Sequence, residues 1–285
     1  MPALTLHLLA LKDTSSIDPK SFVKRLSESP NLKVIVASRP RHVVIYPTII
    51  DVTPLATQQW DLMVLLQQTQ TQENPTQPIP EDLRPAIRTE YRILVGVPSK
   101  LLATYPERDA ALKREAFSSR VPLTGSLEKK VRQGCVGNSS QNLEVSPRLL
   151  AFMDELSREH GDRPVTMLNL LNFRHPGGKE SYFQYGQAFI PVAGKRGGSA
   201  KLVGSVVKPS SAISSDSRGD YNRPEQDWWN EISIVHYPSI GHFCDMLAGD
   251  DYQAINEKYR LKALRDTFLL CTTEFDVEET NSAKL

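Results

Sequence analysis

The 285-residue sequence is poor in cysteine, has almost no net charge and lacks a long apolar run. Its three cysteines, Cys135, Cys244 and Cys271, are odd in number and far apart, which argues against a disulfide framework or a thiolate metal site. Lys plus Arg number 34 and Asp plus Glu 33, and the net charge of +1 excludes the positive field of a dedicated nucleic-acid binder. No apolar stretch reaches the roughly 18 residues that cross a bilayer. We therefore expect neither a nucleic-acid partner nor a membrane association.

Several catalytic motifs are also absent. The sequence has no P-loop, no G-x-G-x-x-G after a strand, no H-E-x-x-H and no G-x-S-x-G. His236 and His242 are its only closely spaced histidines, and no set of carboxylates accompanies them. We therefore predict that the protein uses no metal and no cofactor.

The first half predicts a β-α-β-β-α-β order. Apolar runs bounded by turn residues favour strands, and Asp18-Pro19 opens an amphipathic helix. Strands are expected over 4–11, 33–50 with a break at Arg39-Pro40, 61–67 and 91–97, and helices over 18–29 and 81–90, with a loop over 67–80.

The second half repeats this order after a polar stretch, 116–146, that is interpreted as a linker. An additional amphipathic helix is expected over 147–160. A Ser-rich insertion over 208–226 interrupts the pattern. Strands are expected over 165–173, 200–207, 228–237 and 267–277, and helices over 179–193, from 239 and from 250.

These orders predict an α+β fold made of two tandem ferredoxin-like βαββαβ domains, 1–115 and 147–277, followed by a flexible tail over 278–285. A four-stranded sheet with helices on one face leaves its other face bare. Two such sheets can bury those faces against each other, which predicts an intramolecular α/β-barrel. Whether the tandem chain also forms a homodimer stays open.

The second half contains a recognisable pattern over about residues 160–277. It comprises 164–173 (PVTMLNLLNF), Tyr182, Tyr185, Gly197-Gly198, HYPS at 236–239, and Phe243, Met246, Tyr252, Arg260, Ala263 and Leu264. This pattern resembles the dimeric α/β-barrel superfamily, and within it an uncharacterised family with tandem members in filamentous fungi. The resemblance implies a pocket for a small, often aromatic metabolite between a sheet and its helices. The superfamily includes cofactor-free monooxygenases, isomerases, cyclases, dehydratases, decarboxylases and ligand-sensing domains, so the reaction stays open.

Three residues are candidates for catalysis. His236 ends a central strand, and imidazole titrates near neutral pH, although a structural strand-end histidine is the alternative. Glu231 could orient His236 or act itself, but alternation places the two on opposite sheet faces. His175, with Arg174, follows the first strand of this half and could bind a carboxylate or enolate at a rim; a solvated turn is the alternative.

Five further residues, besides Arg174, are candidates for substrate binding. Asn169 and Asn172 place amides in apolar rows, where they either orient a ligand carbonyl or phenol or close a structural hydrogen-bond network. Tyr182 and Tyr185 share a helical face and could aim hydroxyls into a cavity or pack as core. Trp228 could stack on an aromatic ligand or pack between layers.

The leading hypothesis is therefore a cofactor-independent enzyme of secondary metabolism that acts on a small aromatic or polyketide-like metabolite. Cyclisation, isomerisation, dehydration or decarboxylation would proceed by proton transfer, and cofactor-free oxygenation is a near variant. The alternative is a non-catalytic small-molecule-binding or stress-response protein with the same fold.

The last three residues, Ala283, Lys284 and Leu285, resemble the Ser-Lys-Leu address that a peroxisomal import receptor reads on a free chain end. The alternative is a chance match, because each of the three positions of this address accepts several residue types. The sequence thus leaves a cytoplasmic or a peroxisomal location open.

Overall fold

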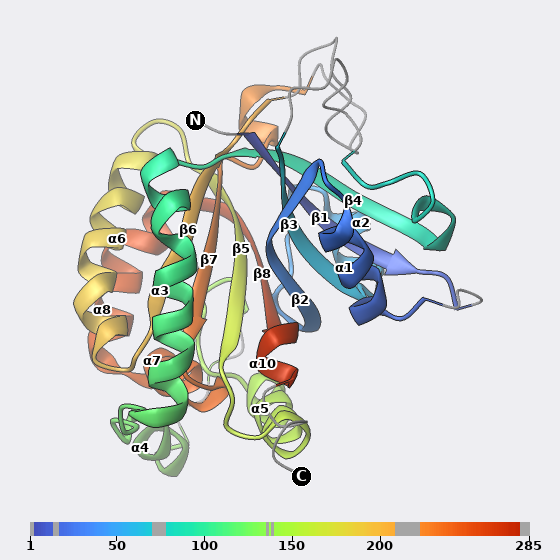
Figure 1. Cartoon of the computed structure of the whole chain (residues 1–285). Helices are drawn as coiled ribbons and strands as arrows, with labels where there is room; N and C mark the ends of the chain where they lie inside the picture. Colours follow the sequence, from blue (N-terminus) through green and yellow to red (C-terminus); the bar gives the residue numbers. More distant parts are fainter. Residues whose placement is uncertain are drawn as a thin grey trace.

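A closed antiparallel barrel of eight strands forms the centre of the molecule (Figure 1). The computed structural model describes residues 3–13, 17–69, 78–134, 137, 140–208 and 223–279. The strands are β1 (Ala3–Leu11), β2 (Leu32–Ile45), β3 (Leu62–Gln68), β4 (Ile87–Gly96), β5 (Val165–Phe173), β6 (Ser199–Val206), β7 (Glu231–Tyr237) and β8 (Leu264–Glu274).

The two halves of the chain contribute neighbouring strands in the same order. Around the barrel the order is β1-β3-β2-β8-β5-β7-β6-β4, so the N-terminal half supplies β4-β1-β3-β2 and the C-terminal half β8-β5-β7-β6. Each four-stranded unit thus has the order expected of a ferredoxin-like sheet. The α+β class and the intramolecular barrel predicted from the sequence are confirmed.

The sheets join at two unequal seams. Ser38–Ile45 of β2 pairs with 269–274 of β8. The seam between β4 and β6 is shorter: Val95 pairs with Val206 and Gly96 with Ser205, and the Val207 amide donates to the Leu94 carbonyl at 2.8 Å. Closure removes the exposed edges that each sheet would present alone.

Alternate residues of each strand fill the barrel interior. Leu168 and Leu170 of β5 pack there with Ile232 and Ile234 of β7, and the side chains are fully buried. The N-terminal half adds Leu4, Leu6, Leu8, Met63, Leu65, Ile93 and Val95.

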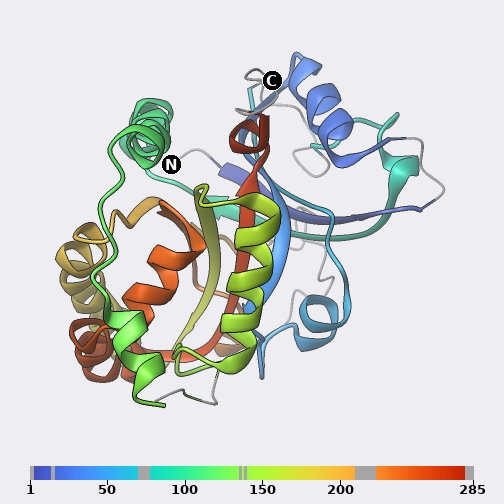
Figure 2. The same cartoon turned by 90° about the horizontal axis from the view of Figure 1, so that it is seen from below.

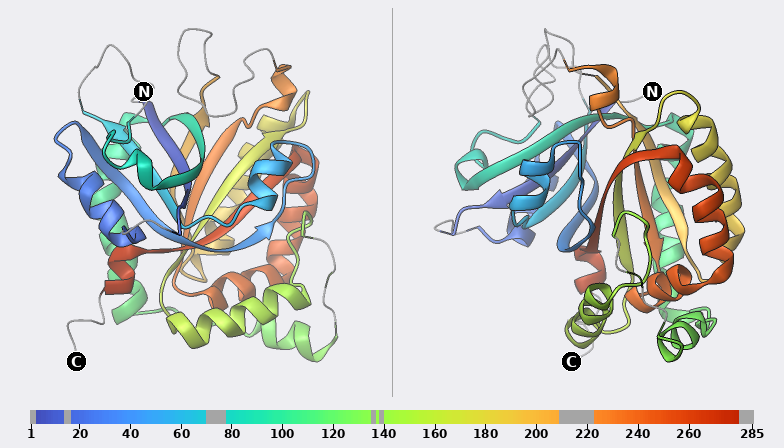
Figure 3. Two further views of the ribbon diagram at one scale, coloured as in Figure 1. Left: turned by 90° about the vertical axis from the view of Figure 1, so that its right-hand side faces the viewer. Right: turned by 180° about the vertical axis from the view of Figure 1, so that it is seen from behind.

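The helices cover the outside of the barrel, and the C-terminal half has the thicker layer (Figures 2 and 3). A second apolar core lies between that half of the sheet and its helices. These helices are α5 (Pro147–His160), α6 (Gly178–Gly194), α7 (Ile240–Ala248), α8 (Asp250–Ile255), a π-helical turn (Asn256–Arg260) and α9 (Leu261–Ala263). The N-terminal half carries α1 (Pro19–Glu28) and the short α2 (Val52–Thr57).

Local sequence signals explain where two of these helices begin. Asp18 precedes α1 and accepts hydrogen bonds from the Lys20 and Ser21 amides, and Ser146 caps α5 through the Leu149 amide. A proline follows each cap at the first helical position, where its missing N–H is not needed.

The helix expected over 81–90 is wrong. Only Arg84–Ala86 forms a turn of 3-10 helix, and β4 begins at Ile87. Pro85 cannot donate a hydrogen bond inside a helix, and the apolar alternation from Tyr91 onward fits a strand that extends back to Ile87.

Besides the short α2, two further helices appear where the sequence predicted no element. α3 (Ser99–Ser118) follows β4 and packs against β6 of the other half, where Arg108 Nη2 donates to the Ala200 carbonyl at 3.0 Å. α4 (Ser126–Arg132) lies within the expected linker, which is held to α7 because Thr124 donates to the carboxylate of Asp245.

Several boundaries also shift. The strand expected from 228 begins at Glu231, and the last strand ends at Glu274, followed by α10 (Phe275–Glu279). Glu278 at the start of the expected flexible tail is bound by Arg39 and Arg41. Most of the expected loop over 67–80, most of the insertion over 208–226 and the tripeptide Ala283–Leu285 lie outside the described residues. Among the helices that are described, none has the length and apolar character to span a membrane.

Candidate functional site

A cavity of about 520 Å³ lies between the outer face of the C-terminal half-sheet and its helices. Its walls are mostly apolar and aromatic, with several polar groups among them. The lining includes Met167, Asn169, Phe173, Lys179, Tyr182, Phe183, Tyr185, Phe189, Ile190, Glu231, Ser233, Phe243, Met246, Tyr252 and Arg260.

The mouth of the cavity lies along α6. Phe183 and Ile190 line the cavity, yet their side chains are 68% and 64% exposed. They are seven residues apart and therefore on one face of the helix. Apolar side chains at the opening suit a ligand with an apolar body.

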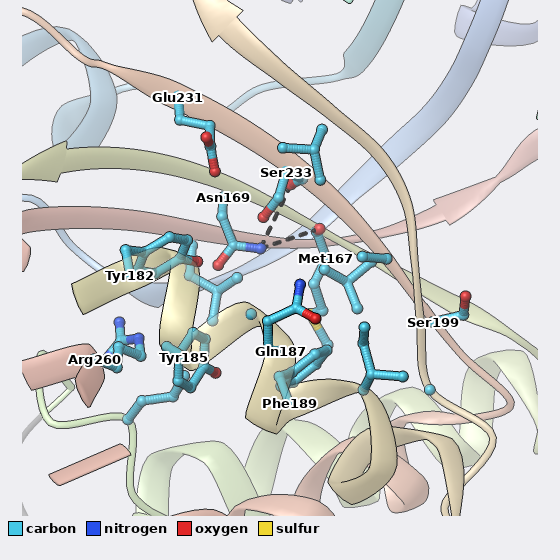
Figure 4. Close-up of a pocket in the computed structure, with 18 of the residues that line it drawn as sticks. Met167, Asn169, Tyr182, Tyr185, Gln187, Phe189, Ser199, Glu231, Ser233 and Arg260 are labelled. Atoms are coloured by element: carbon cyan, nitrogen blue, oxygen red, sulfur yellow. Dashed lines mark hydrogen bonds between the residues drawn. The ribbon is translucent and has the colours of Figure 1, made fainter. Parts of the chain in front are cut away.

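A row of polar side chains from two neighbouring strands lines the sheet side of the cavity (Figure 4). Asn169 of β5 is paired in register with Ser233 of β7, and Glu231 lies two residues before Ser233. The Asn169 amide donates only long hydrogen bonds, at 3.4 Å to the Met167 carbonyl and 3.5 Å to the Ser233 carbonyl. Its hydrogen-bonding capacity is therefore largely left for a ligand.

Glu231 is half-buried at the start of β7. Burial raises the pKa of its carboxyl group to about 7, while the charge of Lys179 acts in the opposite direction. Within the described part of the chain its carboxylate forms no hydrogen bond or ion pair. Both the acid and the carboxylate are consequently populated near neutral pH.

Tyr182 and Tyr185 of α6 form the opposite wall. Their rings continue a row from Phe173 to Phe189, with centroids 5.3 to 5.7 Å apart. Burial raises the pKa of both phenols above the ordinary value, so they act as neutral hydrogen-bonding groups. The Tyr185 hydroxyl lies 3.4 Å from the Tyr252 hydroxyl.

His236 lies on the other face of the sheet. It pairs in register with Thr166 and Ser199, is 1% exposed and does not line the cavity. Burial, with a smaller contribution from Lys201, lowers its pKa to about 3. Its Nδ1 atom has no hydrogen-bond partner among the described residues. The structure therefore separates His236 from Glu231, as their alternation along the strand predicts.

Four other candidate residues also lie away from the cavity. The Asn172 amide donates to the carbonyls of Trp228 at 2.7 Å and Gln226 at 3.0 Å, so it holds the segment before β7. Trp228 is buried and its indole N–H donates to the Arg223 carbonyl. Arg174 and His175 are exposed in the turn after β5. Of the sequence candidates, the cavity thus brings together Asn169, Tyr182, Tyr185 and Glu231.

Sequence reasoning missed Ser233, Tyr252 and Arg260 as site residues. Ser233 shares strand parity with Glu231, which was a usable signal. Arg260 lies eight residues after Tyr252, on the same side of a predicted amphipathic helix, where a charged residue among apolar ones is unusual. Neither signal shows that the space beside these residues is hollow.

Comparisons with known proteins give fold likeness only. No family model and no curated protein matches the chain. Two structures of RPA0582, a protein of unknown function from Rhodopseudomonas palustris, one of them of the methylated protein, are 23% and 24% identical. They match 45% of this chain and 91% and 93% of their own, each with a TM-score of 0.34. A candidate monooxygenase from Lactobacillus acidophilus NCFM is 6% identical and matches 96% of this chain and 93% of its own, with a TM-score of 0.44.

Proposed function

We propose that the protein is an enzyme that binds a small, largely apolar or aromatic metabolite in this cavity and transfers a proton through Glu231. The observation that carries the proposal is the state of that carboxyl group. It lines a mostly apolar cavity, its pKa is about 7, and no described side chain forms an ion pair or hydrogen bond with it. A general base works best when its pKa lies near the working pH.

In this proposal the general acid and base is Glu231, in place of His236, which the sequence analysis favoured. As a carboxylate it removes a proton from an activated C–H or O–H of the ligand, and as the acid it returns the proton to another atom. The negative charge that develops on the ligand oxygen is stabilised by hydrogen bonds from the Asn169 amide and from the hydroxyls of Tyr182 and Ser233. Isomerisation, cyclisation, dehydration and decarboxylation share this step, and oxygenation would add dioxygen as a co-substrate to the same enolate.

The architecture also supports membership of the dimeric α/β-barrel superfamily. Two four-stranded units of identical strand order close one barrel, with helices on the outside and the cavity between sheet and helices. A role in secondary metabolism and a polyketide-like substrate remain part of this proposal.

Hydrogen exchange on aromatic ketones tests the catalytic step without knowledge of the natural substrate. In D₂O near pH 7.5, the wild-type protein should accelerate α-deuteration of 2-tetralone or 2-acetylnaphthalene above the buffer rate, as followed by NMR. Glu231→Gln should lose about 10²-fold or more of that acceleration. Glu180→Gln, on the exposed start of α6, should retain it.

Two outcomes decide between enzyme and binding protein. Acceleration that survives Glu231→Gln removes Glu231 from the mechanism. Ketones that bind the wild-type protein but exchange at the buffer rate contradict catalysis and favour the non-catalytic small-molecule-binding alternative.

A further inference from the structure

Arg260 brings a buried positive charge to the wall of the cavity. Its side chain is 3% exposed, and it ends the π-helical turn Asn256–Arg260 between α8 and α9. Such π turns are rare and occur frequently at functional sites.

Within the described part of the chain, the acceptors that hold the guanidinium group are all neutral. Nη1 donates to the Gln141 carbonyl at 3.2 Å and to Asn256 Oδ1 at 3.4 Å, and Nη2 donates to Thr267 Oγ1 at 3.4 Å. Among the described residues no carboxylate lies within ion-pair distance of Arg260.

The buried carboxylate of Asp266, next to Thr267, has other partners. It accepts hydrogen bonds from the Thr48, Ile49 and Ile50 amides and from the Gln141 side chain. Both of its oxygens are therefore occupied by hydrogen bonds, and neither bonds Arg260 directly.

Arg196 shows how the same chain treats a buried guanidinium with a structural role. It is 1% exposed, and it forms ion pairs with Asp245 at 3.3 Å and Asp251 at 3.0 Å. Burial of a charge is costly unless an opposite charge accompanies it. Arg196 has direct ion-pair partners, and Arg260 has none among the described residues.

The donors of Arg260 that remain have a defined geometry. Of its five N–H groups, the hydrogen bonds within the described chain use three and leave Nε–H and one Nη2–H. Nε–H and an Nη2–H are the donors that form one edge of the planar group, and such an edge matches the two oxygens of a carboxylate.

Three phenols surround the guanidinium. Burial raises the pKa values of Tyr182, Tyr185 and Tyr252, and the charge of Arg260 lowers each of them in part. Figure 4 shows Arg260 beside Tyr182 and Tyr185, with Glu231 beyond Asn169. The cavity therefore has a cationic, hydroxyl-rich region and, separate from it, a titratable carboxyl.

We propose that the ligand of this cavity is an aromatic carboxylic acid whose carboxylate binds the Nε–Nη2 edge of Arg260. The proposal rests on the proposed function for the use of the cavity and adds the chemical class of its substrate. The apolar body of the ligand then packs against Met167, Phe243 and Met246, and its reactive C–H or O–H lies toward Glu231.

A matched pair of probes tests the charge of the ligand separately from its shape. 2-Naphthoate and 2-naphthamide have nearly the same size, and only the first is an anion. By isothermal titration calorimetry at pH 8, the wild-type protein should bind 2-naphthoate at least tenfold more tightly than 2-naphthamide.

Variants locate the source of that preference. Arg260→Gln should bind the two probes equally, and Arg260→Lys, which keeps the charge without the planar edge, should retain a reduced preference. Arg196→Gln, which removes the other buried guanidinium, should keep the wild-type preference. Circular dichroism establishes that each variant is folded, and Arg260→Lys carries the test if Arg260→Gln is not.

The outcomes separate this inference from the proposed function. Equal affinities for the two probes in the wild-type protein, or binding of neither, overturn the carboxylic-acid proposal, as does an undiminished preference in Arg260→Gln and Arg260→Lys. Glu231→Gln should keep or increase the preference for 2-naphthoate, because it removes a negative charge from the cavity. Carboxylate binding with no proton transfer would therefore leave this inference standing while the catalytic proposal fails.

Discussion

Glu231 and Glu274 belong to the same half of the barrel, on β7 and β8, but they face opposite sides of the sheet. Glu231 faces the cavity with no hydrogen-bond or ion-pair partner among the described residues, and burial raises its pKa to about 7. Burial acts in the same direction on Glu274, but the charges of Lys201 and Lys113 outweigh it and hold its pKa well below the ordinary value. The presence of oppositely charged neighbours, rather than the degree of burial, decides whether a glutamate stays ionised or titrates near neutral pH.

Removal of one lysine partner of Glu274 should have the largest effect on stability. Lys201→Met leaves a buried carboxylate with half of its compensation, and we expect a loss of about 3–5 kcal/mol in the free energy of unfolding, measured with urea at pH 7. Lys195→Met, which breaks a more exposed pair with Asp251, should cost less than about 1 kcal/mol. Similar losses in the two variants would contradict the assignment of Glu274 as a buried, paired charge.

The two glutamates also differ in how their contributions to stability depend on pH. The depressed pKa of Glu274 contributes stability above the unfolded value of 4.5, and this stability is lost as the pH falls. The raised pKa of Glu231 acts oppositely, because its contribution is present below pH 4.5 and is lost as the pH rises through about 7.

Glu231→Gln should therefore stabilise the protein at alkaline pH. The shift from 4.5 to about 7 corresponds to a gain of about 3 kcal/mol at pH 8 relative to pH 4, because each pKa unit is worth about 1.4 kcal/mol. Urea unfolding across this range, with Glu180→Gln as the control, measures the gain. Parallel profiles for wild type and Glu231→Gln would show that the carboxyl is ionised normally in the fold.

The two asparagines extend the same comparison with a smaller effect. Asn172→Leu removes the buried amide that donates to the Trp228 and Gln226 carbonyls, and we expect a loss of about 1–3 kcal/mol in unfolding free energy. Asn169→Leu removes only long contacts and should change stability by less than about 0.5 kcal/mol. A larger loss at Asn169 than at Asn172 would reverse the assignment of structural and ligand-facing amides.

The barrel was predictable because its determinants are local. The apolar run over 165–173 and the alternation along 231–237 identify central strands, and the repeated element order restricts how they pair. The helix α3 was missed because Pro106 lies inside it and few of its side chains are buried, so no clear apolar face marks it. Its position is set by contacts across the halves, such as Lys113 with Glu274 at 2.7 Å.

The site was predictable in part for the same reason. Alternation along each strand separates Asn169 from Asn172 and Glu231 from His236. The pairing of β5 with β7, which the structure shows, puts Asn169 on the face of Glu231. Parity does not show which face is hollow, because that depends on how α6 and the π-helical turn pack over the sheet. The choice of His236 as base rested on the ordinary imidazole pKa, which ignores burial and the Lys201 ammonium from a different strand.

The smallest expected effect concerns the titration of His236. Since burial lowers the pKa of His236 to about 3, its imidazole should stay neutral from pH 5 to 8 in the folded protein, and its ¹H–¹⁵N resonances should not move with pH. In urea the same ring should titrate near pH 6.5, the ordinary value. A folded-state midpoint between pH 5 and 8 would show an imidazole that gains a proton despite its burial. It would return a second titrating group to this half of the barrel, on the face opposite Glu231.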